Sequence, residues 1–496
     1  MGYTAYPDKI LYAATGGTGT LQDAINQAQT TKLPLFIAPG NYTTGNLVIS
    51  APVRIYATPG MVMLNPLSST NGFTIDIRSN TPGARISDVT LEGLSFYGGF
   101  LPFATQVDTG ARYVYGQFIR ALGNAAATNF NAIISAYNVD KLRIERCRVS
   151  YSGCCGIAVW GSKALIRDCE VHNNRIAAIY SADNYSTEIL DNFIHDNDNN
   201  SIVVMRSTIG FDGTIVRGNQ VAQTSADFGV QSGQVAGSGW YGNGLCALNA
   251  SDILVTQNVF LNSTFSGVRL DSCFNAQVAN NQIYNCGETA LMWECPVSSP
   301  SGTPGDQNPY RYEGGVVANN VIVNAGVGIS VTNGWNGGRR VTITGNHVKT
   351  VTRNTITTND PSYPQYQTTG AGISGESDCV VSGNIVEDCA SGPGIVLSPG
   401  AASNGSTRKS VDIAVGNTVK GSQIGIAYYH SALGYSLIAS NAVEGSSGGA
   451  IVAVTLPAPY YSYTRVPGST DYGTTAGGLY SGKPTPNLMI GLNFAM

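Results

Sequence analysis

Charged residues are scarce in this sequence, and neither sign dominates. Only 12% of the 496 residues are Asp, Glu, Lys or Arg, and the formal net charge is −4. Chains that bind nucleic acid or anionic lipid usually present a broad cationic surface, and a membrane-spanning helix needs an apolar run of about 20 residues. The sequence contains neither feature. We therefore expect no nucleic-acid partner and no membrane span.

Cysteine occurs at ten positions, but without the spacing that metal sites need. There is no C-x-x-C pair, and Cys147 and Cys169 lie in apolar, strand-like runs. Structural zinc sites normally take closely spaced Cys or Cys/His sets. We expect most of these thiols to be small buried residues. The sequence predicts no metal and no cofactor.

One short phrase recurs from about residue 140 to residue 455 of this glycine-rich chain. It reads apolar, two variable residues, Asn or Cys, one variable residue, apolar, as in Ile144–Val149 and Ile189–Ile194. The steps between successive Asn or Cys positions are 22, 23, 27, 39, 23, 39, 26, 38, 33 and 24 residues. Those positions are Cys147, Cys169, Asn192, Asn219, Asn258, Asn281, Asn320, Asn346, Asn384, Asn417 and Asn441.

A repeat of this length predicts one turn of a single-stranded parallel β-helix, an all-β solenoid. Strands of successive turns then pair in parallel at about 4.8 Å, and their inward Val and Ile side chains form one core. The recurring Asn suits a bend where its amide bonds the backbone and the same amide one turn on. Asn-Gly and Asp-Gly hairpin turns are sparse, which argues against a sandwich or a propeller.

Three segments are expected along the chain. Residues 1–50 form an N-terminal cap with the first strands, because Gly19–Ala28 is typical of a short helix that covers the open first turn. Residues 51–455 form the β-helix, and residues 456–496 form a C-terminal cap or tail rich in Pro, Gly and Tyr. Loop insertions are expected near 222–243, 295–314, 350–370 and 398–410.

Several segments resemble known β-helix proteins. Gly17–Ile25 and Ala38–Tyr42 are similar to the start of pectate-lyase-like proteins, which form right-handed parallel β-helices. This resemblance implies a right-handed fold. Other segments resemble the uncharacterised twin-arginine-exported β-helix repeat proteins of proteobacteria, namely Asp212–Asn219, Gly237–Asn243, Gly267–Arg269, Gly287–Glu294, Gly328–Asn333 and Gly337–Arg339. This second resemblance implies a bacterial protein that is periplasmic or secreted, although the chain shows no signal peptide.

Paired carboxylates are the main catalytic candidates. Aligning the repeats by their inward residues places Asp271 beside Glu294 on the outer face, with Arg269 next to them. Two carboxylates one strand spacing apart cannot both ionise cheaply, so one becomes an acid and the other a base. Glu288, in the turn before the same strand, is a third candidate. The alternative is a set of solvated surface charges paired with Arg269.

Candidate substrate-binding residues lie mainly in the insertions beside these strands. Exposed Trp and Tyr side chains commonly stack on sugars, and loops on a rigid scaffold often carry binding residues. The aromatic side chains could instead pack the loops onto the β-helix. The residues predicted to bind substrate are Trp240, Tyr241, Asn243, His195, Arg311, Tyr312 and Arg339.

Two of the four histidines occupy equivalent repeat positions. His172 and His195 each lie three residues after the recurring Cys or Asn, so we expect them to stack on successive turns. With Asp196 and Asp198 nearby, they form either a second acid/base or metal site or an ordinary polar column on the outer face.

The sequence favours an exported enzyme that cleaves glycosidic bonds of a poly- or oligosaccharide with paired carboxylates. The step from β-helix to carbohydrate rests partly on analogy, because the resembling families mostly process polysaccharides. A polysaccharide lyase or C5 epimerase is the first alternative, with Arg269, Tyr241 and His195 in its site. A non-catalytic carbohydrate-binding or structural surface protein is the second. We expect a monomer or a homotrimer.

Overall fold

The structure is a computed structural model that describes part of the chain. The described residues are 10–13, 19–67, 75–99, 132–153, 155–175, 177–225, 242–294, 313–332, 339–357, 365–376, 378–398, 410–429, 434–454, 464–465, 488–490 and 494–495. The chain divides into two compact units. Unit 1 comprises Met1–Ser207 and Asp212–Gly229, and unit 2 comprises Thr208–Phe211 and Val230–Met496.

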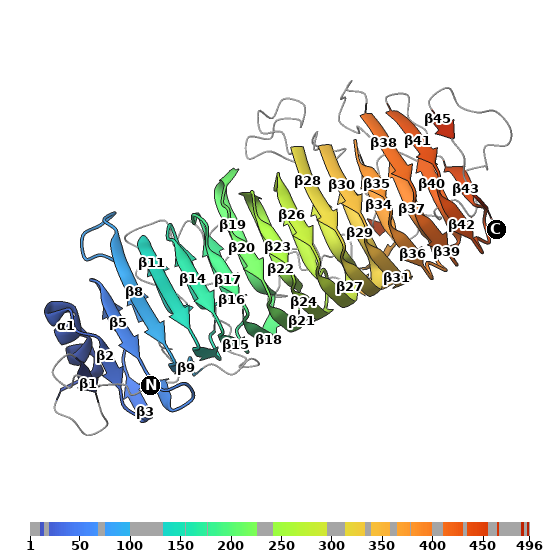
Figure 1. Cartoon of the computed structure of the whole chain (residues 1–496). Coiled ribbons are helices and arrows are strands. Elements are labelled where there is room, and N and C mark those ends of the chain that lie inside the picture. The colour runs from blue at the N-terminus through green and yellow to red at the C-terminus, as the bar shows by residue number, and fades with distance from the viewer. Residues whose placement is uncertain are drawn as a thin grey trace, which may run out of the picture. The chain divides into compact units, whose positions relative to one another are not determined.

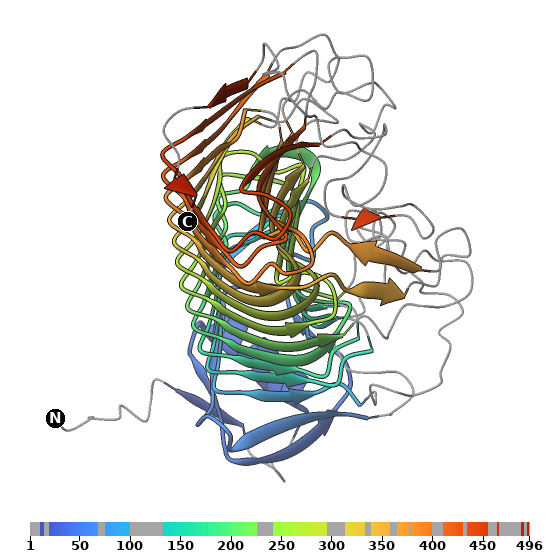
Figure 2. The same cartoon turned by 90° about the vertical axis from the view of Figure 1, so that its right-hand side faces the viewer.

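Each unit is a stack of coils (Figures 1 and 2). The strands of successive coils pair in three parallel strips, here called sheets A, B and C, of which B and C are joined into one 27-stranded sheet. The all-β fold predicted from the repeat is confirmed. In unit 1, sheet A contains β1 (Leu11–Ala13), β2 (Leu35–Ile37), β5 (Val53–Tyr56), β8 (Ile86–Glu92), β11 (Val139–Glu145), β14 (Ala164–Arg167), β17 (Glu188–Leu190) and β20 (Ile215–Arg217).

The other two sheets of unit 1 follow the same order along the chain. Sheet B contains β3 (Gly40–Thr44), β6 (Val62–Pro66), β9 (Ser95–Tyr97), β12 (Arg148–Ser150), β15 (Glu170–His172), β18 (Phe193–Asp198) and β21 (Gln220–Ser225). Sheet C contains β4 (Leu47–Ile49), β7 (Ile75–Ile77), β10 (Ala132–Tyr137), β13 (Cys155–Trp160), β16 (Ala177–Ala182) and β19 (Asn200–Phe211), whose last four residues belong to unit 2.

Unit 2 repeats the arrangement, with two long strands that serve both sheet B and sheet C. Its sheet A contains β23 (Leu254–Thr256), β26 (Ala276–Ala279), β28 (Glu313–Ala318), β30 (Arg339–Thr344), β35 (Val380–Ser382), β38 (Ser410–Val415), β41 (Gly434–Ala439) and β45 (Leu488–Ile490). Sheet B contains β24 (Val259–Ser263), the first halves of β27 (Gln282–Glu294) and β29 (Val321–Thr332), β31 (His347–Val351), β36 (Ile385–Glu387), β39 (Thr418–Lys420), β42 (Ala442–Glu444) and β46 (Phe494–Ala495). Sheet C contains β22 (Asn243–Ser251), β25 (Val268–Asp271), the second halves of β27 and β29, β34 (Ile373–Glu376), β37 (Pro393–Ser398), β40 (Ile424–Tyr429) and β43 (Ile451–Val454).

Columns of aliphatic side chains form the core of each unit. In unit 1, Ile144, Ile166 and Ile189 are in register on successive coils, and all three are fully buried. Val278, Val317 and Ile343 do the same in unit 2. Branched side chains fit a pleated surface well, so each coil buries its apolar face against the next one.

The recurring Asn residues form a ladder of amides at the bend between sheets A and B. The backbone N and Nδ2 of Asn281 both donate to Oδ1 of Asn320, at 3.0 Å each. Asn320 in turn donates to Oδ1 of Asn346 and to the carbonyl of Val278. In unit 2 the ladder runs without a break from Asn258 to Asn441, and the predicted role of the recurring amide is confirmed.

The residue before each ladder position has a left-handed backbone. Asp191 and Asn319 adopt φ values of 54° and 54°, which Asp and Asn tolerate better than most residues. Gly345 takes the same place with φ 66°, where a Cβ atom would lie 2.4 Å from Oδ1 of Asn319. The tight bend therefore favours Asn, Asp or Gly at this position, although Arg146, Gln257 and Ser440 adopt the same left-handed backbone before Cys147, Asn258 and Asn441.

A single helix is described, α1 (Leu21–Thr31), at the start of unit 1. Thr20 caps it, and Asp23 returns the contact to the Thr20 backbone, which satisfies two of the free N–H groups at the helix start. Ile25 and Ala28 are buried where α1 packs on β1, β2, β4 and β5. The helix predicted near Gly19–Ala28 is confirmed. Among the described residues, no helix is long and apolar enough to cross a bilayer.

Three short strands lie outside the stack of unit 2. β32 (Thr355–Thr357) and β33 (Gln365–Thr368) form an antiparallel hairpin in the predicted 350–370 insertion, and Figure 2 shows this pair in orange beside the coils. β44 (Thr464–Arg465) pairs with β33. The other three predicted insertions fall largely outside the described residues. β45 and β46 add parallel strands to sheets A and B, and the C-terminal cap remains a prediction.

The eight described cysteines are all buried. Cys147 and Cys169 occupy the ladder position in the coils before Asn192, and the backbone N of Cys169 donates to Oδ1 of Asn192 at 2.9 Å. This agrees with the packing role expected from the sequence.

Replacing one ladder amide tests what the ladder contributes to stability. Asn320→Ala removes the acceptor of Asn281 and the donor to Val278, and each buried group left unsatisfied costs about 1–3 kcal/mol. We expect the free energy of unfolding to fall by roughly 3 kcal/mol in urea titrations. The control is Asn324→Gly, because Asn324 is exposed and has a positive φ that glycine adopts freely. A similar fall in both variants would contradict a special role for the ladder.

Candidate functional site

The strands of sheet C in unit 2 bring the predicted catalytic residues together. Asp271 of β25 pairs in register with Glu294 of β27, and Arg269 lies two residues before Asp271 on the same face. The inward neighbours Val268, Leu291 and Ile329 also share one column, as the repeat alignment predicts. Asp271 and Glu294 therefore stand one strand spacing apart, about 4.8 Å between backbones.

Arg269 holds two of the three carboxylates of this cluster. Its Nη2 forms an ion pair with Oε1 of Glu294, and its Nη1 lies 3.9 Å from Oε2 of Glu288. The Arg269 and Glu288 side chains are 5% and 2% exposed, whereas the Glu294 side chain is 13% exposed. Of these three side chains, that of Glu294 is the one that solvent reaches most.

Asp271 is the carboxyl of the cluster with a raised pKa. Burial, reinforced by the nearby charge of Glu294, raises the pKa of the Asp271 carboxyl to about 7. Oγ of Ser272 donates to Oδ1 of Asp271 at 2.6 Å and partly offsets that rise. The pair thus contains one carboxyl that holds a proton near neutral pH and one carboxylate that faces a guanidinium.

An irregularity in β27 places Glu288. The register of β27 against β29 shifts between Cys286 and Thr289, where the strand passes from sheet B to sheet C. A bulge of this kind re-aims a side chain, and bulges are frequent beside active sites. Here the irregular stretch carries Glu288 into contact with Arg269.

We expected these side chains to lie on an open outer face, and for most of the cluster this expectation is wrong. Arg269, Asp271 and Glu288 are only 4%, 2% and 2% exposed. Met292, the register neighbour of Arg269, belongs with Val396 of a more distant coil to a buried apolar cluster. The alternation of side chains along a strand shows to which face of the sheet each one points. It does not show what covers that face, so this burial could not be predicted from the sequence.

The residues predicted to bind substrate are mostly outside the described part of the chain or, like Asn243, buried. Trp240, Tyr241, Arg311 and Tyr312 lie outside the described residues, and for Arg339 the structure describes only the backbone of β30. Asn243 is fully buried, and its Oδ1 accepts from the backbone N of Ser266 at 3.1 Å. That contact ties two coils together and keeps the Asn243 side chain away from solvent.

His195 lies in unit 1, whereas the carboxylate cluster lies in unit 2. It pairs in register with His172, and the two rings stack with centroids 4.8 Å apart, as the repeat predicts. Burial lowers the pKa of His172. Together with Glu170, these histidines offer three ligand atoms within 4.8 Å of one another, which is the range of a metal site.

A charged pocket on sheet A of unit 1 was not predicted. Its volume is about 570 Å³, and it lies over β5, β8, β11, β14 and β17. Both acidic and basic side chains line it. The acids are Asp88, Glu92, Glu145 and Glu188, and the bases are Arg54, Lys141, Arg143 and Lys163.

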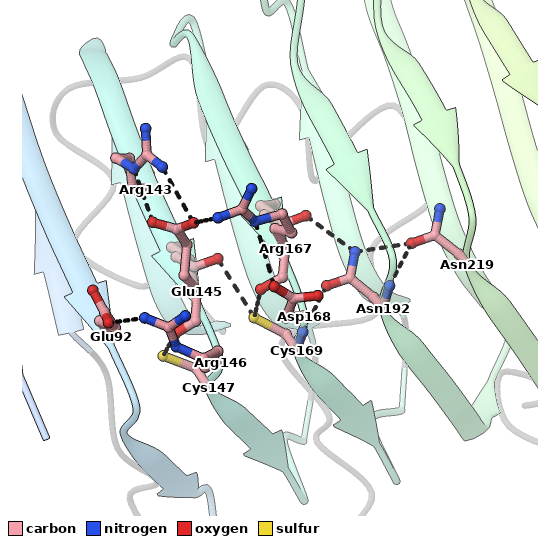
Figure 3. A network of polar contacts seen from close by, with 12 residues as sticks. Glu92, Arg143, Glu145, Arg146, Cys147, Arg167, Asp168, Cys169, Asn192 and Asn219 are labelled. Carbon is pink, nitrogen blue, oxygen red and sulfur yellow. Dashed lines mark hydrogen bonds and ion pairs between the residues drawn. The ribbon is translucent and has the colours of Figure 1, made fainter. Parts of the chain in front are cut away.

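Glu145 is the buried carboxylate of this pocket, and two arginines hold it (Figure 3). Nε of Arg143 donates to Oε2 of Glu145 at 2.8 Å, and Arg167, its register partner on the next coil, bonds Oε1. Burial acts to raise the pKa of Glu145, but the hydrogen bonds and charges of Arg143 and Arg167 outweigh it and hold the pKa low. Opposite charges at one repeat position, Glu145 and Arg167, are the sequence signal that could have revealed the contact.

Glu376 is a second acidic residue that sequence reasoning missed. Val331 pairs with Gly375, so Glu376 of β34 continues the column of Asp271 and Glu294 beyond Thr332. Glu376 is buried. The 350–370 insertion separates this coil from the previous one in sequence and hides the equivalence.

Comparison with known proteins places the chain in a family. A family model described as a right-handed β-helix region matches residues 71–237 and 234–456. Among curated protein sequences, none matches this chain.

Solved structures with a similar fold have low sequence identity. DFA-IIIase from Arthrobacter chlorophenolicus A6, in complex with GF2, is 14% identical with a TM-score of 0.44, over 84% of this chain and 94% of that chain. The N-terminal fragment of bacteriophage phi29 gene product 12 is 10% identical with a TM-score of 0.49, over 92% and 72%. The A-module of a mannuronan C-5 epimerase from Azotobacter vinelandii is 13% identical with a TM-score of 0.39, over 88% and 95%. Such values concern the fold alone, and the family rests on the match over residues 71–456: this chain belongs to the right-handed β-helix family.

Proposed function

We propose that this protein is a carbohydrate-processing enzyme that cleaves glycosidic bonds, with Asp271 and Glu294 as its catalytic pair. The observation that carries the proposal is the in-register placement of a protonated carboxyl beside an arginine-paired carboxylate. Cleavage of a glycosidic bond needs one carboxyl group of each kind. The substrate class, a poly- or oligosaccharide, follows from this chemistry and from the family resemblance.

The roles follow from the two environments. Asp271 donates its proton to the glycosidic oxygen as the bond from that oxygen to the anomeric carbon breaks. Glu294, whose side chain is the more exposed, attacks the anomeric carbon, and water later releases the sugar from it. Adjacent parallel strands hold the backbones of the pair about 4.8 Å apart. That backbone spacing favours the roughly 5–5.5 Å carboxyl separation of retaining enzymes over the wider separation of inverting ones.

Two alternatives receive less support from this geometry. A uronate lyase or epimerase would use Arg269 to neutralise a substrate carboxylate, but Arg269 already faces Glu294 and Glu288. A purely structural role would not need these charges, because the same columns hold Cys246, Leu248 and Met292 on other coils. Burying ionised groups lowers the stability of the folded chain, whereas burying apolar residues at the same positions does not. A periplasmic or secreted location is supported by the family resemblance.

Activity measurements with two variants test the catalytic pair. A general acid or its partner typically contributes 10²–10⁴-fold, so we expect Asp271→Asn and Glu294→Gln each to lower the rate of reducing-end release by about that factor. The substrates are a panel of neutral and acidic polysaccharides, with absorbance of unsaturated uronates followed in parallel.

Glu376→Gln is the matched control, because Glu376 is a buried carboxylate of the same column on a more distant coil. It should keep most of the activity. Unsaturated products that survive in Glu294→Gln would favour a lyase and overturn the proposed pair. If no polysaccharide of the panel yields a product, the proposed glycosidic cleavage is rejected for these substrates.

The raised pKa of Asp271 predicts how stability depends on pH. The pKa is about 7 in the folded chain and about 3.9 in an unfolded one, so the folded state binds more protons between these values. The free energy of unfolding therefore falls as pH rises from about 4 to 7, and the loss is complete above the folded pKa. Asp271→Asn removes this contribution, so the variant should lose less stability than the wild type between pH 5 and pH 8.

Urea midpoints across that pH range give the measurement. Asp140→Asn serves as the control, because Asp140 is exposed and the hydrogen bond from Arg85 lowers its pKa. We expect this control to lose stability over that range as the wild type does. Equal pH dependence in Asp271→Asn and the wild type would show that Asp271 is ionised in the folded chain at neutral pH.

A further inference from the structure

Two stacked histidines and a glutamate converge on sheet B of unit 1. Nε2 of His195 lies 3.4 Å from Oε1 of Glu170, and Nε2 of His172 lies 3.9 Å from the same oxygen. In the described part of the chain, the ligand atoms of these residues all lie within 4.8 Å of one another. They belong to β15 and β18, far along the sequence from the residues assigned to glycosidic cleavage.

Contacts at Nδ1 leave the Nε2 atom of each ring on the side of Glu170. Nδ1 of His172 lies 2.6 Å from Oδ1 of Asn173, and Nδ1 of His195 lies 2.7 Å from Oδ2 of Asp196. An amide carbonyl and a carboxylate only accept hydrogen bonds, so each Nδ1 carries a proton. Nε2 of His172 therefore has the lone pair that accepts from Nε of Arg148. Nε2 of His195 faces Oε1 of Glu170, a second acceptor, and a metal ion would take the place of the proton between them. An oxygen acceptor behind the far nitrogen is the support that metal-binding histidines generally have.

Neighbouring aromatic rings hold the imidazoles in place. The two imidazole rings are nearly parallel, at an angle of 4°. Phe193 stacks on His195 with centroids 4.3 Å apart, and Tyr151 meets His172 edge-on. Strand pairing between β15 and β18 sets the spacing of the two histidines. The nitrogen ligands are thus positioned by the fold rather than by mobile loops.

We propose that Glu170, His172 and His195 bind a divalent transition-metal ion of the zinc type. Zinc bonds to nitrogen and oxygen of about 2.0–2.2 Å in a tetrahedron place ligand atoms roughly 3.3 Å apart. Nε2 of His195, at 3.4 Å from Oε1 of Glu170, already fits this spacing, and Nε2 of His172, at 3.9 Å, has to move closer. Two imidazoles and one carboxylate suit zinc and its neighbours in the transition series, whereas calcium and magnesium prefer oxygen ligands. Three protein ligands leave a fourth position for water or a substrate atom.

Arg148 occupies the place that the ion would take. Its Nε donates to Nε2 of His172 at 3.1 Å and lies 3.3 Å from Oε2 of Glu170. The Arg148 side chain is 49% exposed, so it can swing into solvent when an ion binds. Arg148 is the cation that neutralises Glu170 in the absence of metal, and removing it should strengthen metal binding.

Cobalt titration of tag-free protein tests the site, because Co²⁺ in a tetrahedral zinc-type site gives visible absorption bands. We expect one Co²⁺ per chain, displaced by Zn²⁺ and retained in excess Mg²⁺ or Ca²⁺. His195→Ala and Glu170→Gln should each weaken binding at least tenfold. Asp196→Asn alters only the exposed support of His195 and should weaken binding about 10-fold to 100-fold. Arg148→Ala should bind more tightly than the wild type.

His347→Gln is the matched control. His347 forms the same kind of cross-coil contact with one carboxylate, at 3.0 Å from Glu387, but without a second histidine. This variant should bind Co²⁺ as the wild type does, and circular dichroism should show each variant to be folded. The absence of a stoichiometric Co²⁺ band in the wild type would overturn the proposal. So would equal binding in the wild type and a folded His195→Ala variant.

Discussion

In-register parallel pairing between successive coils is the constraint on which the rest of the structure depends. Each residue lies beside its equivalent one coil further along, so any repeat position becomes a column of side chains. An aliphatic column gives the core, and an amide column gives the Asn ladder. The same rule turns His172 and His195 into a stacked pair and brings Asp271 beside Glu294. Function in this architecture arises from what two neighbouring coils place in one column.

Columns also create an electrostatic problem, because like charges at one repeat position are forced together. The two units handle it in opposite ways. Glu145 receives one arginine from its own strand and one from the next coil, and its pKa falls. Asp271 is more deeply buried and has Glu294 as its register partner, while Arg269 bonds to Glu294, so the pKa of Asp271 rises. One fold thus yields a permanently charged clamp and a proton-holding pair.

The repeat made most of the fold predictable, but it revealed only part of the site. Register follows from periodicity, so the columns through Val268, Leu291 and Ile329 could be assigned from sequence. Burial over Arg269 and Asp271 could not, because it depends on what packs outside the sheet. Glu376 was missed because an insertion interrupts the repeat before it. The contacts of Glu145 were missed because the repeat was recognised from its apolar and Asn or Cys positions. Pairing of opposite charges between coils leaves no trace in that pattern.

The ladder has a consequence for how such a chain tolerates new sequence. The step from Asn258 to Asn281 is 23 residues, whereas the next step, to Asn320, is 39, yet the amide contacts are the same. The entropy of closing a loop grows only with the logarithm of its length, so the longer coil costs about 0.5 kcal/mol more. Extra segments can therefore be added beside Glu294 at little energetic cost, and recognition can diverge while the coils that hold the chemistry stay unchanged.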